Sequence, residues 1–342
     1  MKYIPPVGTV GAMAWLLCFA AACTQAASSE PPCTNEERAL DFGFYAYYEP
    51  VSYSADGDAG APGFDRHRGY EADLLTALEA MDPKLSFSRR GIEAWSGIWL
   101  LPAGPRFDIV GGGITILDSR TRDPSGRTAV VFTSGHIEFR QSLLVRAEDA
   151  ERFARHRDLT SANRVGVLAG TTGEARLLVL TGLADGDGVL AAGTRVDTPA
   201  GTVVADGSVA YAINAAGASP ALTGRQALRP ASDTLPTVVY FAEDPASIKA
   251  LAAGSIDAIA RGEVGNRAEV RVHGDAFAVT ALDRQVEQGG FALAVEDAGL
   301  AACLDHHIGW LTDGGRIGYR EWLDDPTVFL RRARQPVAGE SH

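Results

Sequence analysis

The sequence contains very little lysine and no run of basic residues. Of its 342 residues only Lys2, Lys84 and Lys249 are lysines, and the formal net charge is −12 at pH 7. Proteins that bind nucleic-acid backbones need clustered lysine and arginine to neutralise the phosphates. The composition therefore excludes a nucleic-acid partner and favours an acidic globular protein.

Only one long apolar stretch is present, and it lies at the N-terminus. Residues 7–23 follow the basic Lys2 and end in small residues, which is typical of an export signal over residues 1–23. The sequence AAAC at the end of this stretch resembles a bacterial lipobox, in which Cys23 is lipidated and tethers the chain to the membrane. Ala20 stands where that pattern prefers leucine, so plain cleavage after a small residue is the alternative. Either signal predicts a periplasmic protein, with a linker over residues 24–37.

Cysteine is also scarce, which limits disulfides and metal sites. Of four cysteines, Cys18 and Cys23 fall in the signal, and Cys33 and Cys303 remain. In an exported protein these two could form a disulfide, because the compartment is oxidising. Two unpaired thiols are the alternative. No cysteine or histidine pair has zinc-binding spacing, so we expect no metal.

Beyond the linker, strand-like apolar runs alternate with segments of helical periodicity. Residues 184–236 differ, because their Gly, Ala, Thr and Val predict β-hairpins inserted into the second half. The alternation predicts an α/β fold with largely parallel sheets. The expected strands are 39–53, 85–90, 106–116, 141–147, 164–170, 237–242, 256–262 and 291–297, and the expected helices are 70–81, 93–101, 171–183, 244–254 and 298–315.

Seven short motifs occur in an order that resembles extracellular solute-binding proteins of family 3, the periplasmic receptors of amino-acid ABC transporters. The resemblance covers about residues 39–330 apart from the insertion. The motifs are GYEADL (69–74), WSGI (95–98), RFDIVGGGITILDSR (106–120), VVFTSG (130–135), RVGVLAGTTGEA (164–175), GSIDAI (254–259) and LTDGGRIGYREWL (311–323).

The resemblance implies a two-lobed fold, the type II periplasmic binding protein fold. Two crossing strands would join the lobes and let them close on a ligand like a hinge. Lobe 1 would comprise residues 38–141 and 290–330, and lobe 2 residues 142–289 with the insertion at 184–236. The chain would act as a monomer without cofactor and deliver a small carboxylated solute to an ABC permease in the inner membrane.

The glycine-rich turn in the third motif matches the family's carboxylate site. Gly113 would let the backbone approach the ligand, Thr115 would donate from its hydroxyl and amide, and Arg120 would grip the carboxylate bidentately. From lobe 2, Thr171 and Thr172 at a helix N-terminus would contact the same charge. A surface arginine and an ordinary threonine cap are the plainer interpretations.

Two aromatic residues match the walls of the family's pocket. Tyr48 and Trp95 would sandwich the ligand's body, with core packing as the alternative. The aspartate that usually holds the ligand's ammonium is absent, and Gly262 stands in its place. Either Glu263 substitutes for it, or the ligand lacks an ordinary α-ammonium. We favour the second on sequence grounds, because Glu263 and Gly262 would point to opposite faces of a strand.

Two other functions remain open at this stage. Cyclohexadienyl dehydratases resemble this sequence more distantly and would need a general acid in the cleft, for which Glu174 or Glu263 could serve. A soluble sensor domain of a signalling system would have the same fold without a permease partner. We expect a binding protein and no enzyme.

Overall fold

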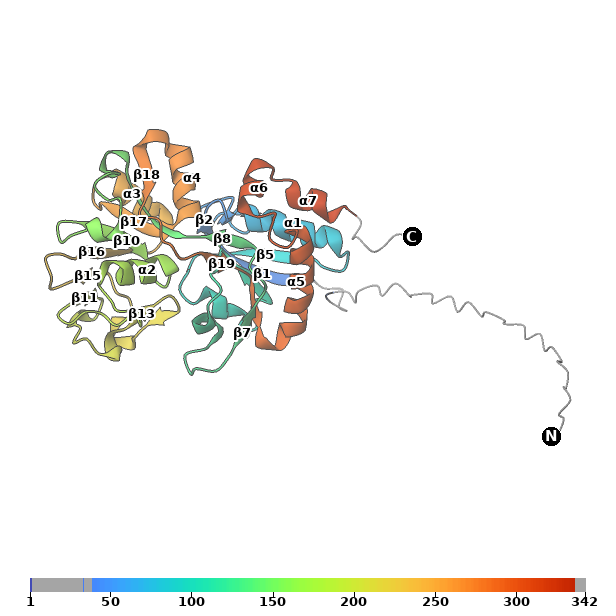
Figure 1. The fold of residues 1–342 in the computed structure, drawn as a ribbon, viewed down its shortest axis with the longest axis horizontal. Helices are drawn as coiled ribbons and strands as arrows, with labels where there is room; N and C mark the ends of the chain where they lie inside the picture. Colours follow the sequence, from blue (N-terminus) through green and yellow to red (C-terminus); the bar gives the residue numbers. More distant parts are fainter. Residues whose placement is uncertain (2–32, 34–38, 336–342) are drawn as a thin grey trace. The chain divides into compact units, whose positions relative to one another are not determined.

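The computed structural model describes residue 1, residue 33 and residues 39–335, and Figure 1 shows their arrangement. The expected export signal, the lipidation site Cys23 and most of the linker lie outside the described residues. None of the helices in the described part of the chain is long and apolar enough to cross a membrane.

A five-stranded sheet forms the core of the first lobe. Its strand order is β5-β1-β6-β20-β7, with β1 parallel to both β5 and β6 and β20 antiparallel to its neighbours. The interior strand β1 is almost wholly apolar and buried, as expected for a strand covered on both faces. Its strands are β1 (Leu40–Tyr45), β5 (Phe87–Ile92), β6 (Ile109–Gly111), β7 (Val130–Phe132) and β20 (Ala292–Ala294), and its helices are α1 (Tyr70–Met81), α5 (Ala298–Leu311), α6 (Tyr319–Asp324) and α7 (Val328–Ala333).

An eight-stranded mixed sheet forms the second lobe, in the order β12-β11-β15-β16-β10-β17-β9-β18. Strands β11, β12 and β15 come from the inserted segment and extend one edge of this sheet, while β13 and β14 form a separate hairpin. The elements are β9 (Gln141–Arg146), β10 (Arg164–Leu168), α2 (Thr172–Thr181), β11 (Arg195–Thr198), β12 (Gly201–Val204), β13 (Ile213–Asn214), β14 (Gly217–Ala218), β15 (Ala227–Arg229), β16 (Thr237–Phe241), α3 (Asp244–Ala252), β17 (Ala258–Gly262), α4 (Glu263–His273) and β18 (Phe277–Thr280).

Two antiparallel strands connect the sheets. Strand β8 (Ile137–Phe139) leads from the first sheet into β9, and β19 (Glu287–Gly289) returns from β18 to β20, and the two pair with each other. This is the two-lobed α/β fold with two crossing strands. Strands of the first sheet fall within residues 40–132 and 292–294, and those of the second within 141–280.

Several elements differ from the sequence-based expectation. The expected strand 106–116 is only three residues long in β6, because Gly112 and Gly113 adopt positive φ angles of 140° and 66° and turn the chain. The expected strand 39–53 is broken into β1 and a small sheet of β2 (Tyr47–Tyr48), β3 (Ser52–Ser54) and β4 (His67–Arg68). The expected helix 93–101 is a 3₁₀ turn at Ile98–Ala103.

The structure joins Cys33 to Cys303 of α5 in a disulfide with a Cα–Cα distance of 5.3 Å. Together with His307 these cysteines make the one cluster of potential metal ligands found among the described residues. Their sulfurs are bonded to each other and are not thiolates, so the cluster lacks the ligands that a soft metal needs.

Candidate functional site

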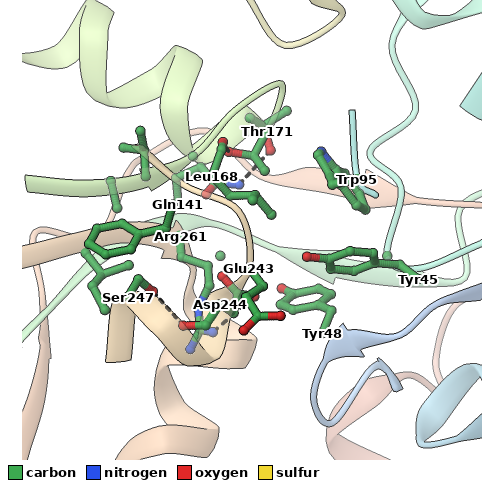
Figure 2. A pocket seen from close by; sticks show the side chains of 18 of the residues that line it. Tyr45, Tyr48, Trp95, Gln141, Leu168, Thr171, Glu243, Asp244, Ser247 and Arg261 are labelled. Atoms are coloured by element: carbon green, nitrogen blue, oxygen red, sulfur yellow. Dashed lines mark hydrogen bonds and ion pairs between the residues drawn. The ribbon is translucent and has the colours of Figure 1, made fainter. Parts of the chain in front are cut away.

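A small cavity of about 50 Å³ lies between residues of the two lobes and is walled mainly by aromatic side chains. Six of the eight residues predicted to bind ligand line this cavity, and Arg120 and Glu263 do not. Figure 2 shows rings from lobe 1 on one side and carboxylates from α3 on the other. The six are Tyr48, Trp95, Gly113, Thr115, Thr171 and Thr172.

The aromatic wall is built from the end of β1, from β2 and from the segment that follows β5. Tyr45, the last residue of β1, meets Trp95 edge-to-face with ring centroids 5.1 Å apart. Trp95 donates from its indole N–H to the carbonyl of Gly170 in lobe 2 at 3.0 Å, so it also bridges the lobes. The Tyr45 hydroxyl is buried and has no hydrogen-bond partner.

Three glycines make room for the ring of Tyr48. A Cβ atom would lie 2.6 Å from the Tyr48 hydroxyl at Gly262, 2.8 Å from its ring at Gly265 and 2.7 Å from its ring at Gly113. The φ angle of Gly262 is −54°, which any residue can adopt, so this glycine is required by space alone. The departure from the family's aspartate at position 262 therefore has a structural cause: the Tyr48 side chain occupies that space.

At one end of the cavity, a network of hydrogen bonds engages all the side-chain donors. Gln141 donates to the Thr172 hydroxyl at 2.8 Å and to Glu287 at 3.0 Å, and Thr115 donates to the same oxygen of Glu287 at 3.0 Å. The hydroxyls of Thr115 and Thr172 are 3.3 Å apart, which leaves the Thr172 proton for Thr115. Every donor in this network is engaged within the protein.

The acceptor of this network, Glu287, was not found by sequence analysis. It begins the crossing strand β19 and is only 4 % exposed, and its second oxygen has no hydrogen-bond partner. Thr115 thus binds a carboxylate of the protein itself, and Thr172 is linked to that carboxylate only through Thr115 and Gln141. No local sequence pattern marks Glu287, because only the pairing of β19 with β8 carries it to this position.

Arg120 does not occupy the position expected of a ligand clamp. It is fully buried and donates to three backbone carbonyls: Thr115 at 3.2 Å, Gly170 at 3.0 Å and Ala215 at 3.0 Å. Its guanidinium also lies 4.3 Å from the ring centre of Trp99. These nitrogens join lobe 1, lobe 2 and the insertion, and the bidentate grip of Arg120 on a ligand stays a prediction.

The surroundings of Arg120 still keep it charged. Burial lowers the pKa of Arg120 to about 9, and the nearby carboxylate of Glu287 opposes that shift. A pKa of about 9 leaves the guanidinium charged at neutral pH.

Thr171 and Glu263 also have local roles. The Thr171 hydroxyl caps α2 by accepting the Glu174 amide N–H at 3.0 Å and donates to the Leu168 carbonyl at 2.8 Å. Glu263 begins α4 and pairs with Arg267 at 3.0 Å, facing a different groove. Strand β17 ends at Gly262 and Glu263 begins a helix, so in this structure the Glu263 side chain does not line the cavity, and its role as a substitute for the missing aspartate stays a prediction.

Charged residues that sequence analysis missed line the other end of the cavity. Glu243 and Asp244 lie at the start of α3, and Arg261 comes from β17. Arg261 is paired with Asp244 at 3.2 Å and with Glu269 at 3.5 Å. The alternation in β17 could have placed Arg261, but the approach of α3 is a tertiary feature.

A buried glutamate supports the turn that carries Gly113. Glu71 of α1 is fully buried and accepts the Gly113 amide N–H at 2.9 Å. Burial raises the pKa of Glu71 to about 8, partly offset by hydrogen bonds from Gly113 and Gly112. His136 lies 3.7 Å away, and burial lowers its pKa to about 3. Glu71 thus positions the turn without entering the cavity.

Comparison with known proteins identifies the fold. No protein-family model matches the sequence, and the search of curated proteins gave no match. The substrate-binding protein of an amino acid ABC transporter is 16% identical, with a TM-score of 0.57 over 84% of this chain and 98% of that chain. An ancestral amino acid-binding protein, described as a precursor of cyclohexadienyl dehydratase, is 18% identical, with a TM-score of 0.54 over 84% and 94%.

A third similar structure is the arginine-, lysine-, histidine-binding protein ArtJ of Geobacillus stearothermophilus, 18% identical with a TM-score of 0.54 over 87% of this chain and 100% of that chain. At these identities the likeness establishes the fold. The chain has the two-lobed fold of periplasmic substrate-binding proteins.

Proposed function

We propose that this protein is the solute-binding component of an ABC importer and captures a small solute in the cavity between its lobes. The observation that carries this is the aromatic cavity itself, which gathers side chains from both lobes and contains a buried hydroxyl, that of Tyr45, without a partner. The lobes would close on the solute by rotation about β8 and β19 and present it to a permease in the inner membrane.

We do not propose that the solute carries the carboxylate group expected from the sequence. The donors assigned to it are engaged with the protein: Thr115 binds Glu287, and Arg120 binds three carbonyls. A solute carboxylate at that end would have to displace these bonds and approach a buried glutamate.

A dehydratase is not favoured by the site. Glu174, one candidate general acid, is fully buried and paired with Arg225 at 2.7 Å. Glu263, the other, faces a different groove. Neither lies in position to protonate a group in the cavity.

A thermal-shift screen of the purified protein against amino acids, amines, carboxylic acids and sugars tests the binding function. We expect at least one solute to raise the melting temperature, Tyr48→Ala to abolish the rise, and Tyr53→Ala, outside the cavity, to retain it. Absence of any shift, confirmed by calorimetry, would refute the function. Genes for a permease and an ATPase beside this gene would distinguish the importer component from a sensor domain.

A further inference from the structure

We propose that the cavity takes a compact organic cation without a carboxylate, such as an amine or a quaternary ammonium compound, and that Glu287 permanently fills the place of a ligand carboxylate. This proposal rests on the proposed function and specifies the solute class of the same cavity. Three independent features of the described residues support it.

The first feature is the hydrogen-bond network at the Thr115 end. Thr115 and Gln141 donate to Glu287. Gln141 also donates to the Thr172 hydroxyl, whose own proton is left for Thr115. A second carboxylate here would meet no free side-chain donor of this network and would lie close to a like charge. The positive charge that could attract it, Arg120, already donates to three backbone carbonyls.

The second feature is the charge of the lining. Among the described residues that line the cavity, Glu243 and Asp244 are acidic and Arg261 is the one cation. Two carboxylates, Asp244 and Glu269, neutralise Arg261. Glu243 remains half-buried at the start of α3, and no ion pair with a cation is found for it in the described part of the chain. The lining thus has an excess of negative charge.

The third feature is the aromatic wall. Tyr45, Tyr48 and Trp95 lie opposite Glu243 and Asp244 in Figure 2. Aromatic faces attract cations through their quadrupole, and they are used to recognise quaternary ammonium groups. The hydroxyl of Tyr45, buried at 1 % exposure and without a partner, lies in the same lining and can accept an N–H from an ammonium group.

The size of the cavity further restricts the solute. A volume of about 50 Å³ accommodates only a few water-sized groups, so a compact head group fits better than a long chain. Position 262 has no aspartate to hold an ammonium group, and the carboxylates of Glu243 and Asp244 at the start of α3 would hold it instead. The sequence favoured a solute that lacks an α-ammonium group. We propose instead a solute that has an ammonium group and lacks a carboxylate.

Calorimetry with matched pairs that differ by a carboxylate tests the proposal: choline and glycine betaine, isobutylamine and valine, and putrescine and ornithine. We expect at least one of the three cations to bind, with its carboxylated counterpart at least tenfold weaker. Glu243→Gln should weaken that cation about tenfold, whereas Glu151→Gln, an exposed carboxylate outside the cavity, should have no effect.

A second variant probes the internal carboxylate directly. Glu287→Gln removes the charge but retains an acceptor, so the carboxylated counterpart should gain about tenfold in affinity while the cation loses little. Thermal unfolding of this variant shows whether it is folded, and the wild-type comparison stands without it.

A carboxylated counterpart that binds wild type as tightly as its cation, or another solute that binds while all three cations fail, would overturn the cation proposal and leave solute binding intact. No binding by any solute in the wider screen would overturn the proposed function as well.

Discussion

The two ends of the cavity differ in which polar groups lack a partner. At the Thr115 end every side-chain donor of the network is engaged, and the buried atoms without a partner are two acceptors, Oε1 of Gln141 and Oε1 of Glu287. At the Tyr45 end, a buried hydroxyl has no partner and Glu243 has no counter-charge among the described residues. Because buried polar groups are normally paired, a ligand gains most by pairing with the free groups, which can accept a hydrogen bond at both ends. Each end combines predicted residues, such as Thr115 or Tyr48, with residues that the sequence did not indicate, such as Glu287 or Glu243.

The largest effect should come from removing the arginine beside the Thr115 end. Arg120→Ala leaves three buried carbonyls without their donor, so we expect the free energy of unfolding to fall by about 3–5 kcal/mol in urea denaturation. Arg122→Ala, whose exposed side chain pairs only loosely with Asp118 at 3.6 Å, should change it by less than about 0.5 kcal/mol. Unchanged stability with lost solute binding would restore Arg120 as a ligand clamp.

Glu71, beneath the turn at the same end, should make stability depend on pH. Its pKa is about 8 in the folded protein, whereas an unfolded glutamate titrates near ~4.3, so the folded state holds the extra proton between these values. The free energy of unfolding should therefore fall as pH rises through this window. Glu71→Gln should remove a decrease on the order of a few kcal/mol.

His136 has the opposite effect at lower pH and must be separated from Glu71. Its pKa is about 3 when folded, so its contribution to stability is lost only as pH falls below the unfolded value of ~6.5. Urea denaturation of wild type and Glu71→Gln between about pH 6.5 and 8 isolates the glutamate. Parallel curves for the two proteins in that range would contradict the assignment.

An intermediate effect is expected where Tyr48 meets lobe 2. Gly262→Ala places a Cβ atom 2.6 Å from the Tyr48 hydroxyl and should lower the free energy of unfolding by about 1–3 kcal/mol. Tyr48→Phe removes that oxygen, so the double variant should recover part of the loss. Additive losses in the double-mutant cycle would show that Gly262 is not there to accommodate Tyr48.

The smallest effect is expected at Tyr45, and its sign distinguishes the two ends. Tyr45→Phe removes a buried hydroxyl without a partner, so thermal unfolding should show unchanged stability or a gain of up to about 1 kcal/mol. Solute binding should weaken by up to about tenfold, because the hydroxyl is expected to bind the solute. Loss of stability with unchanged binding would mean that the hydroxyl serves the fold.

The sequence predicted the order of the elements well because their signals are local. The apolar spacing of Tyr70–Met81 and the threonine cap before α2 are readable within one turn of helix, and the insertion at 184–236 does form short strands. Boundaries failed where the chain turns for tertiary reasons, as at Gly112 and Gly113.

The positions of Tyr48, Trp95, Gly113, Thr115, Thr171 and Thr172 around one cavity followed from family motifs in the sequence. The hydrogen-bond partners of the polar residues could not be predicted from those motifs. Glu287 is 172 residues from Thr115, and Ala215 is 95 residues from Arg120, and no local pattern encodes such pairs. Hydrogen bonds are short and directional, so the folded arrangement alone decided that Arg120 binds carbonyls and that Thr115 donates to Glu287.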